Sequence, residues 1–193
     1  MAKDMVEYTF SVEDTEYFKE LVSTQAPQSI AAVARIPQWA KLDIEKSRTI
    51  VVLDGVQDPG NVGTILRLCS GFDATVLALE SVDITNPKVI RSSAGAMFMV
   101  PWLKMNRPNG HAYLEKLSAS RKIFRLEKKS NGKNIEELTT ASDIILIAGS
   151  EGNGIILDTT GTSISINHNK NLESLNISHA LAIALHSRYQ AHT

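Results

Sequence analysis

The chain has 193 residues, of which 43% are hydrophobic and 21% are charged, and its formal net charge is −1. These values are typical of one ordinary soluble domain with an extension, and they exclude the strong overall positive charge of many nucleic-acid binders. The single cysteine, Cys69, excludes an internal disulfide, and no run approaches the ~20 apolar residues of a membrane span. The first eight residues lack the apolar core of a secretory signal. We expect an intracellular protein without a membrane partner, cytoplasmic unless an organelle-targeting segment precedes this sequence.

The first 48 residues predict an extension and not a separate domain. A helix is expected over Val12–Ser23 and a short buried strand over Ser29–Ile36, followed by a polar linker from Pro37 to Ser47. These pieces are too few for an independent core, which indicates the tail of a larger domain.

From Thr49 to Thr193 strands and helices alternate, as in a single α/β domain. Ile50–Leu53 and Thr75–Leu79 read as strands, and Gly71 is placed to end the helix between them. Apolar residues with helical spacing form the core-facing stripe of that helix: Val62, Ile65, Leu66, Cys69 and Phe72. A strand, a helix and a second strand in this order predict parallel pairing.

The remaining sequence continues this alternation. Strands are expected over Asp143–Ala148 and Ser163–Ile166, and helices over His111–Ser120 and Ser174–Gln190. Residues 88–96 are weakly patterned, and the apolar run 97–103 is interrupted by a proline. The sequence therefore predicts a parallel sheet covered by helices.

Three polar or glycine-rich loops each follow a predicted strand, at Gln57–Asn61, Gly149–Gly154 and Asn167–Ser174. The carboxyl ends of parallel strands share one edge, where ligands bind in open α/β folds, so the loops predict a composite pocket. The glycines allow either a simple tight turn or the direct approach of backbone to a ligand. No dinucleotide-binding or P-loop glycine pattern is present, and no acidic or Cys/His cluster predicts a metal.

Taken singly, the polar residues of these loops have ordinary readings. Arg67 fits a solvent-facing position beside the apolar stripe, and Asn176 fits the N-cap of the last helix. The basic stretch Arg121–Lys133 is either a solvated surface or a local RNA-binding patch.

Taken together, these segments resemble a known family. Asp58–Arg67 (DPGNVGTILR), Gly149–Gly154 (GSEGNG) and Leu172–Ser178 (LESLNIS) are similar, in this order, to the three motifs of the SpoU (SPOUT-class) RNA ribose 2′-O-methyltransferases. Residues 87–96 also resemble a family segment, and the similarity extends over about Thr49–Tyr189. Three ordered motifs are far more specific than one glycine loop.

The resemblance implies a SPOUT α/β fold with a C-terminal trefoil knot, which is a rare exception among proteins. It further implies S-adenosylmethionine as methyl donor with no metal, an rRNA or tRNA substrate, and a homodimer with residues from both subunits near the site. Residues 23–33 resemble the end of the family's substrate-recognition domain, so the extension 1–48 would be the remnant of one.

The resemblance also assigns site residues. Those implied in the reaction are Asn61, Arg67, Glu151, Ser174 and Asn176. Those implied in cofactor binding are Gly149, Ser150, Gly152, Gly154, Ile166, Asn167 and Leu175. A guanidinium holds its proton too tightly to act as a base, so we expect Arg67 to pair with an RNA phosphate or with the developing alkoxide.

The third motif departs from the family pattern. The family segment begins Ile-Pro-Met with a glycine two residues later, whereas this chain has Ile166-Asn167-His168-Asn169-Lys170. His168 is either a catalytic base or a plain loop histidine, and the second is the more common case. The altered loop and the near-neutral charge keep two alternatives open: a catalytically weakened SPOUT-like RNA-binding or assembly protein, and a base-directed RNA methyltransferase of the same class.

Overall fold

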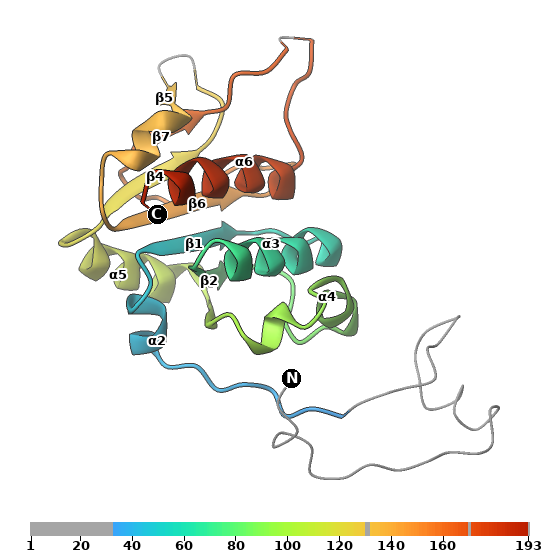
Figure 1. Ribbon diagram of the computed structural model, residues 1–193. Helices are drawn as coiled ribbons and strands as arrows, with labels where there is room; N and C mark the ends of the chain where they lie inside the picture. The colour runs from blue at the N-terminus through green and yellow to red at the C-terminus, as the bar shows by residue number, and fades with distance from the viewer. Residues whose placement is uncertain (1–32, 130–131, 170, 193) are drawn as a thin grey trace. The chain divides into compact units, whose positions relative to one another are not determined.

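The computed structural model describes residues 33–129, 132–169 and 171–192 (Figure 1). Residues 36–193 form a compact unit that carries the fold described below. Its helices are α2 (Lys41–Glu45), α3 (Pro59–Gly71), α4 (Pro87–Ser92), η2 (Ala96–Phe98), α5 (Arg107–Ser118), η3 (Ile135–Thr139) and α6 (Ile177–Gln190). No helix among these residues is long and apolar enough to cross a membrane.

Seven parallel strands form one sheet in the order β3-β2-β1-β6-β4-β7-β5. Their bounds are β1 (Thr49–Asp54), β2 (Ala74–Leu79), β3 (Trp102–Met105), β4 (Lys122–Leu126), β5 (Lys133–Asn134), β6 (Ile144–Gly149) and β7 (Thr162–Ser165). In the register of the two central strands, Asp54 at the end of β1 lies beside Gly149 at the end of β6. The carboxyl ends of all the strands therefore meet at one edge.

Helices cover both faces of the sheet, and successive residues of a strand point to opposite faces. Val51 and Leu53 of β1 pack with α3 and α6, which lie beside each other in Figure 1. Ile50 and Val52 pack on the other face, in a cluster that includes residues of α5 and Ile44 of α2. Strands β1, β2 and β6 are nearly inaccessible along their length, which explains their continuous apolar sequences.

The expected parallel βαβ unit is confirmed by β1, α3 and β2, and Gly71 is the last residue of α3. The other strands and helices expected after Thr49 are present with bounds shifted by a few residues. Helix α5 begins at Arg107 because the Asn106 side chain caps it, accepting from the Asn109 amide at 2.9 Å.

One interpretation of the polar segments is wrong, and a second is incomplete. Residues 37–47 are not merely a polar linker, because they contain α2, whose Ile44 is fully buried. Four of the six cations in the basic stretch are exposed, as a solvated surface predicts: Lys122, Lys128, Lys129 and Lys133. The stretch also contains β4, which lies between β6 and β7. Arg121 donates hydrogen bonds to the carbonyls of Ser47 and Glu45, so its guanidinium stabilises the fold.

Two N-terminal expectations lie largely outside the described residues. The helix expected over Val12–Ser23 falls wholly outside them, as does the first half of the strand expected over Ser29–Ile36. Residues 33–36 are described and are not in a strand.

Candidate active site

The site lies where the strand order reverses. The chain runs from β1 outward through β2 and β3, and the later strands lie on the other side of β1, with β6 directly beside it. Such a reversal leaves a crevice at the carboxyl edge of a parallel sheet, which is where ligands bind in open α/β folds. The loops after β1, β6 and β7 all begin at this edge, as the sequence predicted.

Asn61, Glu151 and Asn176 form a hydrogen-bonded cluster at this edge. The Asn61 side-chain nitrogen donates to Glu151 Oε1 at 3.2 Å, and Asn176 Nδ2 donates to the same oxygen at 2.9 Å and to Asn61 Oδ1 at 3.0 Å. Asn61 is held in the first turn of α3 because its amide donates to Asp58, the N-cap, at 2.7 Å. The cluster joins all three sequence motifs.

Asn176 serves both the helix and the cluster. Its Oδ1 caps α6 by accepting from the Ser178 amide at 2.9 Å and from the Ser178 hydroxyl at 2.7 Å. The exposed His179 also bonds this oxygen through Nδ1, at 3.1 Å. With the oxygen committed to the cap, only Nδ2 faces Asn61 and Glu151. The expected cap is confirmed, and it fixes the orientation of the amide.

The glycine-rich segment after β6 is a tight turn with no room for side chains at its base. Ser150 and Gly154 exchange backbone hydrogen bonds at 3.1 and 2.9 Å. A Cβ at Gly149 would collide with the backbone of Gly154, and Gly154 itself has φ +64°. The turn therefore brings bare backbone to the sheet edge.

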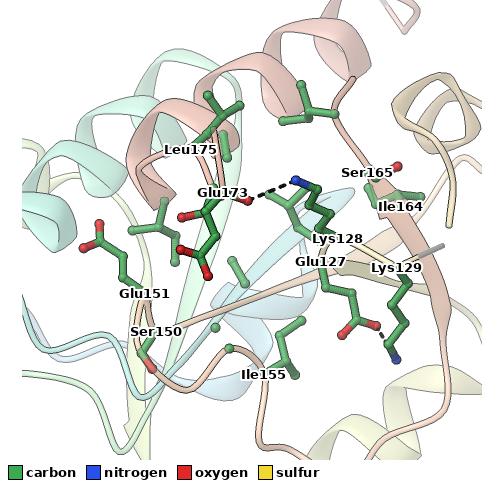
Figure 2. A pocket seen from close by; sticks show the side chains of 18 of the residues that line it. Glu127, Lys128, Lys129, Ser150, Glu151, Ile155, Ile164, Ser165, Glu173 and Leu175 are labelled. Atoms are coloured by element: carbon green, nitrogen blue, oxygen red, sulfur yellow. Dashed lines mark hydrogen bonds and ion pairs between the residues drawn. The ribbon is translucent and has the colours of Figure 1, made fainter. Parts of the chain in front are cut away.

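A cavity of about 410 Å³ lies beside this turn, between the ends of β4, β6 and β7 and the start of α6 (Figure 2). Seven of the residues assigned from the sequence line it: Gly149, Ser150, Glu151, Gly154, Ile166, Ser174 and Leu175. Gly152 and Asn167 are exposed and do not line it, whereas Asn61 and Asn176 lie next to it through Glu151.

The residues present fit a nucleoside-sized cofactor. The cavity volume is in the usual range for small-molecule sites, ~300–1,000 Å³. Its walls combine apolar side chains, among them Ile155, Ile164 and Ile177, with the backbone of the glycine turn and with polar and charged side chains. No group of three or more His, Cys, Asp or Glu side chains suited to a metal occurs within the described part of the chain.

One wall of the cavity, residues 126–129 after β4, was not assigned from the sequence. Lys128 Nζ donates to the carbonyls of Leu172 and Glu173 at 3.4 and 3.2 Å, and so ties this wall to the third motif (Figure 2). Burial would raise the pKa of Glu127, but hydrogen bonds from Ser163, Lys129 and Arg125 outweigh it and lower the pKa. The apolar residues Ile123, Phe124 and Leu126 were the available sequence signal for a strand before this wall, and the surrounding charged residues obscured it.

Asp54 was also missed, although it organises the loop beside the cavity. Its carboxylate is fully buried and accepts from Arg107 Nε at 2.7 Å and from the amides of Ile156 and Leu157 at 2.6 and 2.7 Å. Its carbonyl accepts from the Ser150 amide at 3.2 Å. Asp54 thus holds both ends of the glycine turn, and a lone carboxylate ending a β-branched strand was its only sequence signal.

Comparison with known families decides the relationship. Residues 48–186 match the model of the SpoU rRNA Methylase family. The chain belongs to the SpoU family. It is 32% identical over 174 residues to the 23S rRNA (guanosine(2553)-2'-O)-methyltransferase RlmP of Bacillus subtilis, a match that covers 88% of this chain and 68% of that protein. It is 30% identical over 184 residues to the 23S rRNA (adenosine(1067)-2'-O)-methyltransferase of Streptomyces azureus, covering 91% and 67%.

Solved structures agree with this SpoU-family fold. The AdoMet-bound rRNA methyltransferase from Sinorhizobium meliloti superposes with a TM-score of 0.71 at 22% identity, over 79% of this chain and 61% of that one. The SpoU methyltransferase AviRb from Streptomyces viridochromogenes gives 0.69 at 20% identity, over 81% and 66%. The SpoU chain thus spans about two thirds of the length of these proteins.

In this SpoU chain, Arg67 stands apart from the cluster. It lies on α3 nearly two turns beyond Asn61 and is exposed. Its guanidinium makes no hydrogen bond or ion pair with any other residue that the structure describes. The solvent-facing position expected from the sequence is confirmed, and the cation is open to a binding partner.

Proposed function

We propose that this chain is an S-adenosylmethionine-dependent RNA methyltransferase that methylates a ribose 2′-hydroxyl in rRNA or tRNA. The observation that carries the proposal is the contact of Asn61, Glu151 and Asn176 beside a nucleoside-sized cavity. Membership of the SpoU family supports it, as do the activities of the two relatives named above, which are rRNA 2′-O-methyltransferases.

The cofactor would occupy the cavity beside the glycine turn. It would be held through backbone groups and apolar contacts by five of the residues that line this cavity: Gly149, Ser150, Gly154, Ile166 and Leu175. When bound, S-adenosylmethionine supplies a sulfonium methyl group that an oxygen nucleophile can attack. Methyl transfer of this kind requires no metal from the protein. Gly152 and Asn167 are exposed, and their contact with the cofactor stays a prediction.

The cluster would position the ribose. Asn61 and Asn176 both donate to Glu151 Oε1, which fixes the carboxylate and leaves Oε2 without a hydrogen bond to any described residue. That oxygen can accept a hydrogen bond from the ribose, with the exposed Ser174 hydroxyl at the cavity mouth as a second contact. A 2′-hydroxyl is a weak nucleophile, so it must lose its proton as it attacks.

Arg67 would assist that proton loss electrostatically. Its positive charge stabilises an RNA phosphate or the developing alkoxide, which makes deprotonation easier. The separation of Arg67 from the cluster within one chain supports a homodimer in which a second copy presents Arg67 to the site. The trefoil knot and the role of residues 1–48 as the end of a substrate-recognition domain belong to the same proposal.

The two alternatives differ in what they require of the cavity. A catalytically weakened RNA-binding protein needs no donor site, and the nucleoside-sized cavity with its glycine turn favours the enzyme. A base-directed methyltransferase shares the donor site, so the chemistry of the product distinguishes it. Titration with S-adenosylmethionine by calorimetry tests the first alternative. Nucleoside analysis of RNA methylated by the protein tests the second.

The decisive variant is Arg67→Ala. We expect it to abolish methyl transfer to rRNA or tRNA while the affinity for S-adenosylmethionine changes less than twofold, because Arg67 does not line the cavity. Lys116→Ala, which removes a cation from the last turn of α5, is the matched control and should keep full activity. Loss of donor binding in Arg67→Ala would contradict the role. Absence of donor binding by the unmodified protein at millimolar concentration would contradict the proposed function.

A further inference from the structure

His168 presents a buried ring nitrogen that has no partner. Its Nδ1 lies 2.7 Å from the carbonyl oxygen of Ile166, two residues earlier, while Nε2 is shielded from solvent and bonds no group in the described part of the protein. The residue lines the cavity beside the glycine turn. Buried polar atoms are nearly always satisfied, so an unsatisfied one at a cavity wall indicates a partner supplied by a ligand.

The contact with Ile166 determines which nitrogen carries the proton. A carbonyl oxygen only accepts hydrogen bonds, so Nδ1 must be the donor in the neutral imidazole as well as in the cation. The neutral ring therefore presents a lone pair at Nε2, and the protonated ring presents an N–H there. Methionine, which the family pattern has at this position, offers no comparable acceptor.

The charge of the ligand favours the neutral ring. S-adenosylmethionine carries a positive sulfonium, a positive ammonium group and a negative carboxylate, so its net charge is positive, and its adenine amine and ammonium group are N–H donors. Neutral Nε2 can accept from such a donor, whereas an imidazolium repels the sulfonium charge. The other ionisable groups that line the cavity are Glu127, Lys128, Lys129, Glu151 and Glu173. Histidine is the side-chain type whose ordinary change of charge falls between about pH 5 and 8.

We propose that Nε2 of His168 accepts a hydrogen bond from an N–H group of the bound methyl donor, and that donor affinity in this chain therefore increases with pH as the imidazole loses its charge. The inference rests on the proposed function, because it assigns a specific contact within the same donor site. It also gives the altered Asn167-His168-Asn169 segment a binding role in place of the lost proline and methionine.

Calorimetry of the full chain with S-adenosylmethionine at pH 5.5 and pH 8.0 tests this proposal. Three substitutions are compared with the unmodified protein. His168→Met restores the family residue and removes the acceptor, and His168→Gln keeps an acceptor that does not titrate. His111→Gln removes a histidine from α5, away from the cavity, as a control. Thermal unfolding of each variant verifies that it is folded.

We expect the unmodified protein and His111→Gln to bind about fivefold more tightly at pH 8.0 than at pH 5.5, the effect of one hydrogen bond. His168→Met should bind about fivefold more weakly at pH 8.0 and show a flat profile, and His168→Gln should be flat near the unmodified affinity at pH 8.0. S-adenosylhomocysteine lacks the sulfonium charge and should show a smaller pH effect.

Two results are separable. If His168→Met binds the donor as tightly as the unmodified protein and keeps its pH profile, the inference is overturned while the proposed function stands. If the unmodified protein binds no donor at either pH, the proposed function fails, and the inference fails with it. A ¹⁵N spectrum of the imidazole in the ligand-free protein supplies a readout independent of binding. A proton on Nε2 and none on Nδ1 in the neutral ring would contradict the geometry on which the inference depends.

Discussion

Replacing Asp54 by Asn tests whether one buried carboxylate organises the loop beside the cavity. In the protein, Oδ1 accepts from Arg107 Nε, and Oδ2 accepts from the amides of Ile156 and Leu157. An asparagine has one acceptor oxygen and one NH₂ group. If its oxygen faces the two amides, its NH₂ opposes the Arg107 guanidinium, and both groups are donors.

The expected cost follows from these contacts. Removing one partner of a buried ion pair costs about 3–5 kcal/mol of unfolding free energy. The Arg107 side chain is 31% exposed, so water replaces part of the lost interaction. We therefore expect Asp54→Asn to lower the free energy of unfolding by about 2–3 kcal/mol, which corresponds to about 5–10 °C in Tm for a domain of this size. Donor affinity should fall several-fold, because Ile155 of the same loop lines the cavity.

Urea unfolding and amide hydrogen exchange measure the two parts of this effect. Exchange should accelerate at Ile156 and Leu157 in Asp54→Asn, and Asp158→Asn, an exposed carboxylate of the same loop, should leave both measurements unchanged. Arg107→Met in the Asp54→Asn background removes the opposed donor and should recover part of the lost stability. A surface substitution usually changes the free energy of unfolding by no more than roughly 0.5 kcal/mol. If the free energies of unfolding of Asp54→Asn and Asp158→Asn differ by no more than this amount, the reasoning is refuted.

Three further outcomes are expected. Gly149→Ala should weaken donor binding more than tenfold, because its Cβ meets the Gly154 backbone. Gly71→Ala, with open space around its Cβ, is the control and should bind normally; equal affinities would exclude the steric argument. Arg188→Met should lower the free energy of unfolding by about 3 kcal/mol or more, because this buried guanidinium donates hydrogen bonds to four backbone carbonyls and one hydroxyl. Urea titration measures this change, and a decrease of less than about 1 kcal/mol would contradict the prediction. Burial raises the pKa of the Cys69 thiol, so a thiol reagent at pH 8 should label it only on unfolding, and rapid labelling of the native protein would be inconsistent.

The central elements were predictable because their patterns are unambiguous. The apolar runs of β1 and β6 and the helical spacing in α3 match strands and helices buried by the sheet. Parallel order then placed three motif loops at one edge before any contact was known. Strand β4 escaped prediction because its Lys122 and Arg125 read as surface charges. In the structure, Arg125 is nearly buried against backbone carbonyls.

The site was predictable as a set of loops but not as a set of contacts. Asn176 looked like a cap from its position, and no local pattern reveals that its amide also reaches residues 115 and 25 positions away. Asp54 and Lys128 act on segments distant in sequence, so their roles depend on the register of the sheet. The roles assigned to Arg67 and Ser174 stay predictions that substitution must test.

The position of β6 in the sheet also determines when the fold can be completed during synthesis. Strand β6 lies between β1 and β4, and both neighbours of β4 come later in the chain than β4 itself. A nascent chain that ends before Ile144 can pair β1 with β2 and β2 with β3, while the apolar side chains of Ile123 and Phe124 on β4 are not yet covered by β6. Such an interval favours chaperone binding or aggregation. Asn61 can make its hydrogen bond with Asn176 only after Asn176 has been synthesised. The site of a nascent chain would therefore be complete only once translation has passed the start of the last helix.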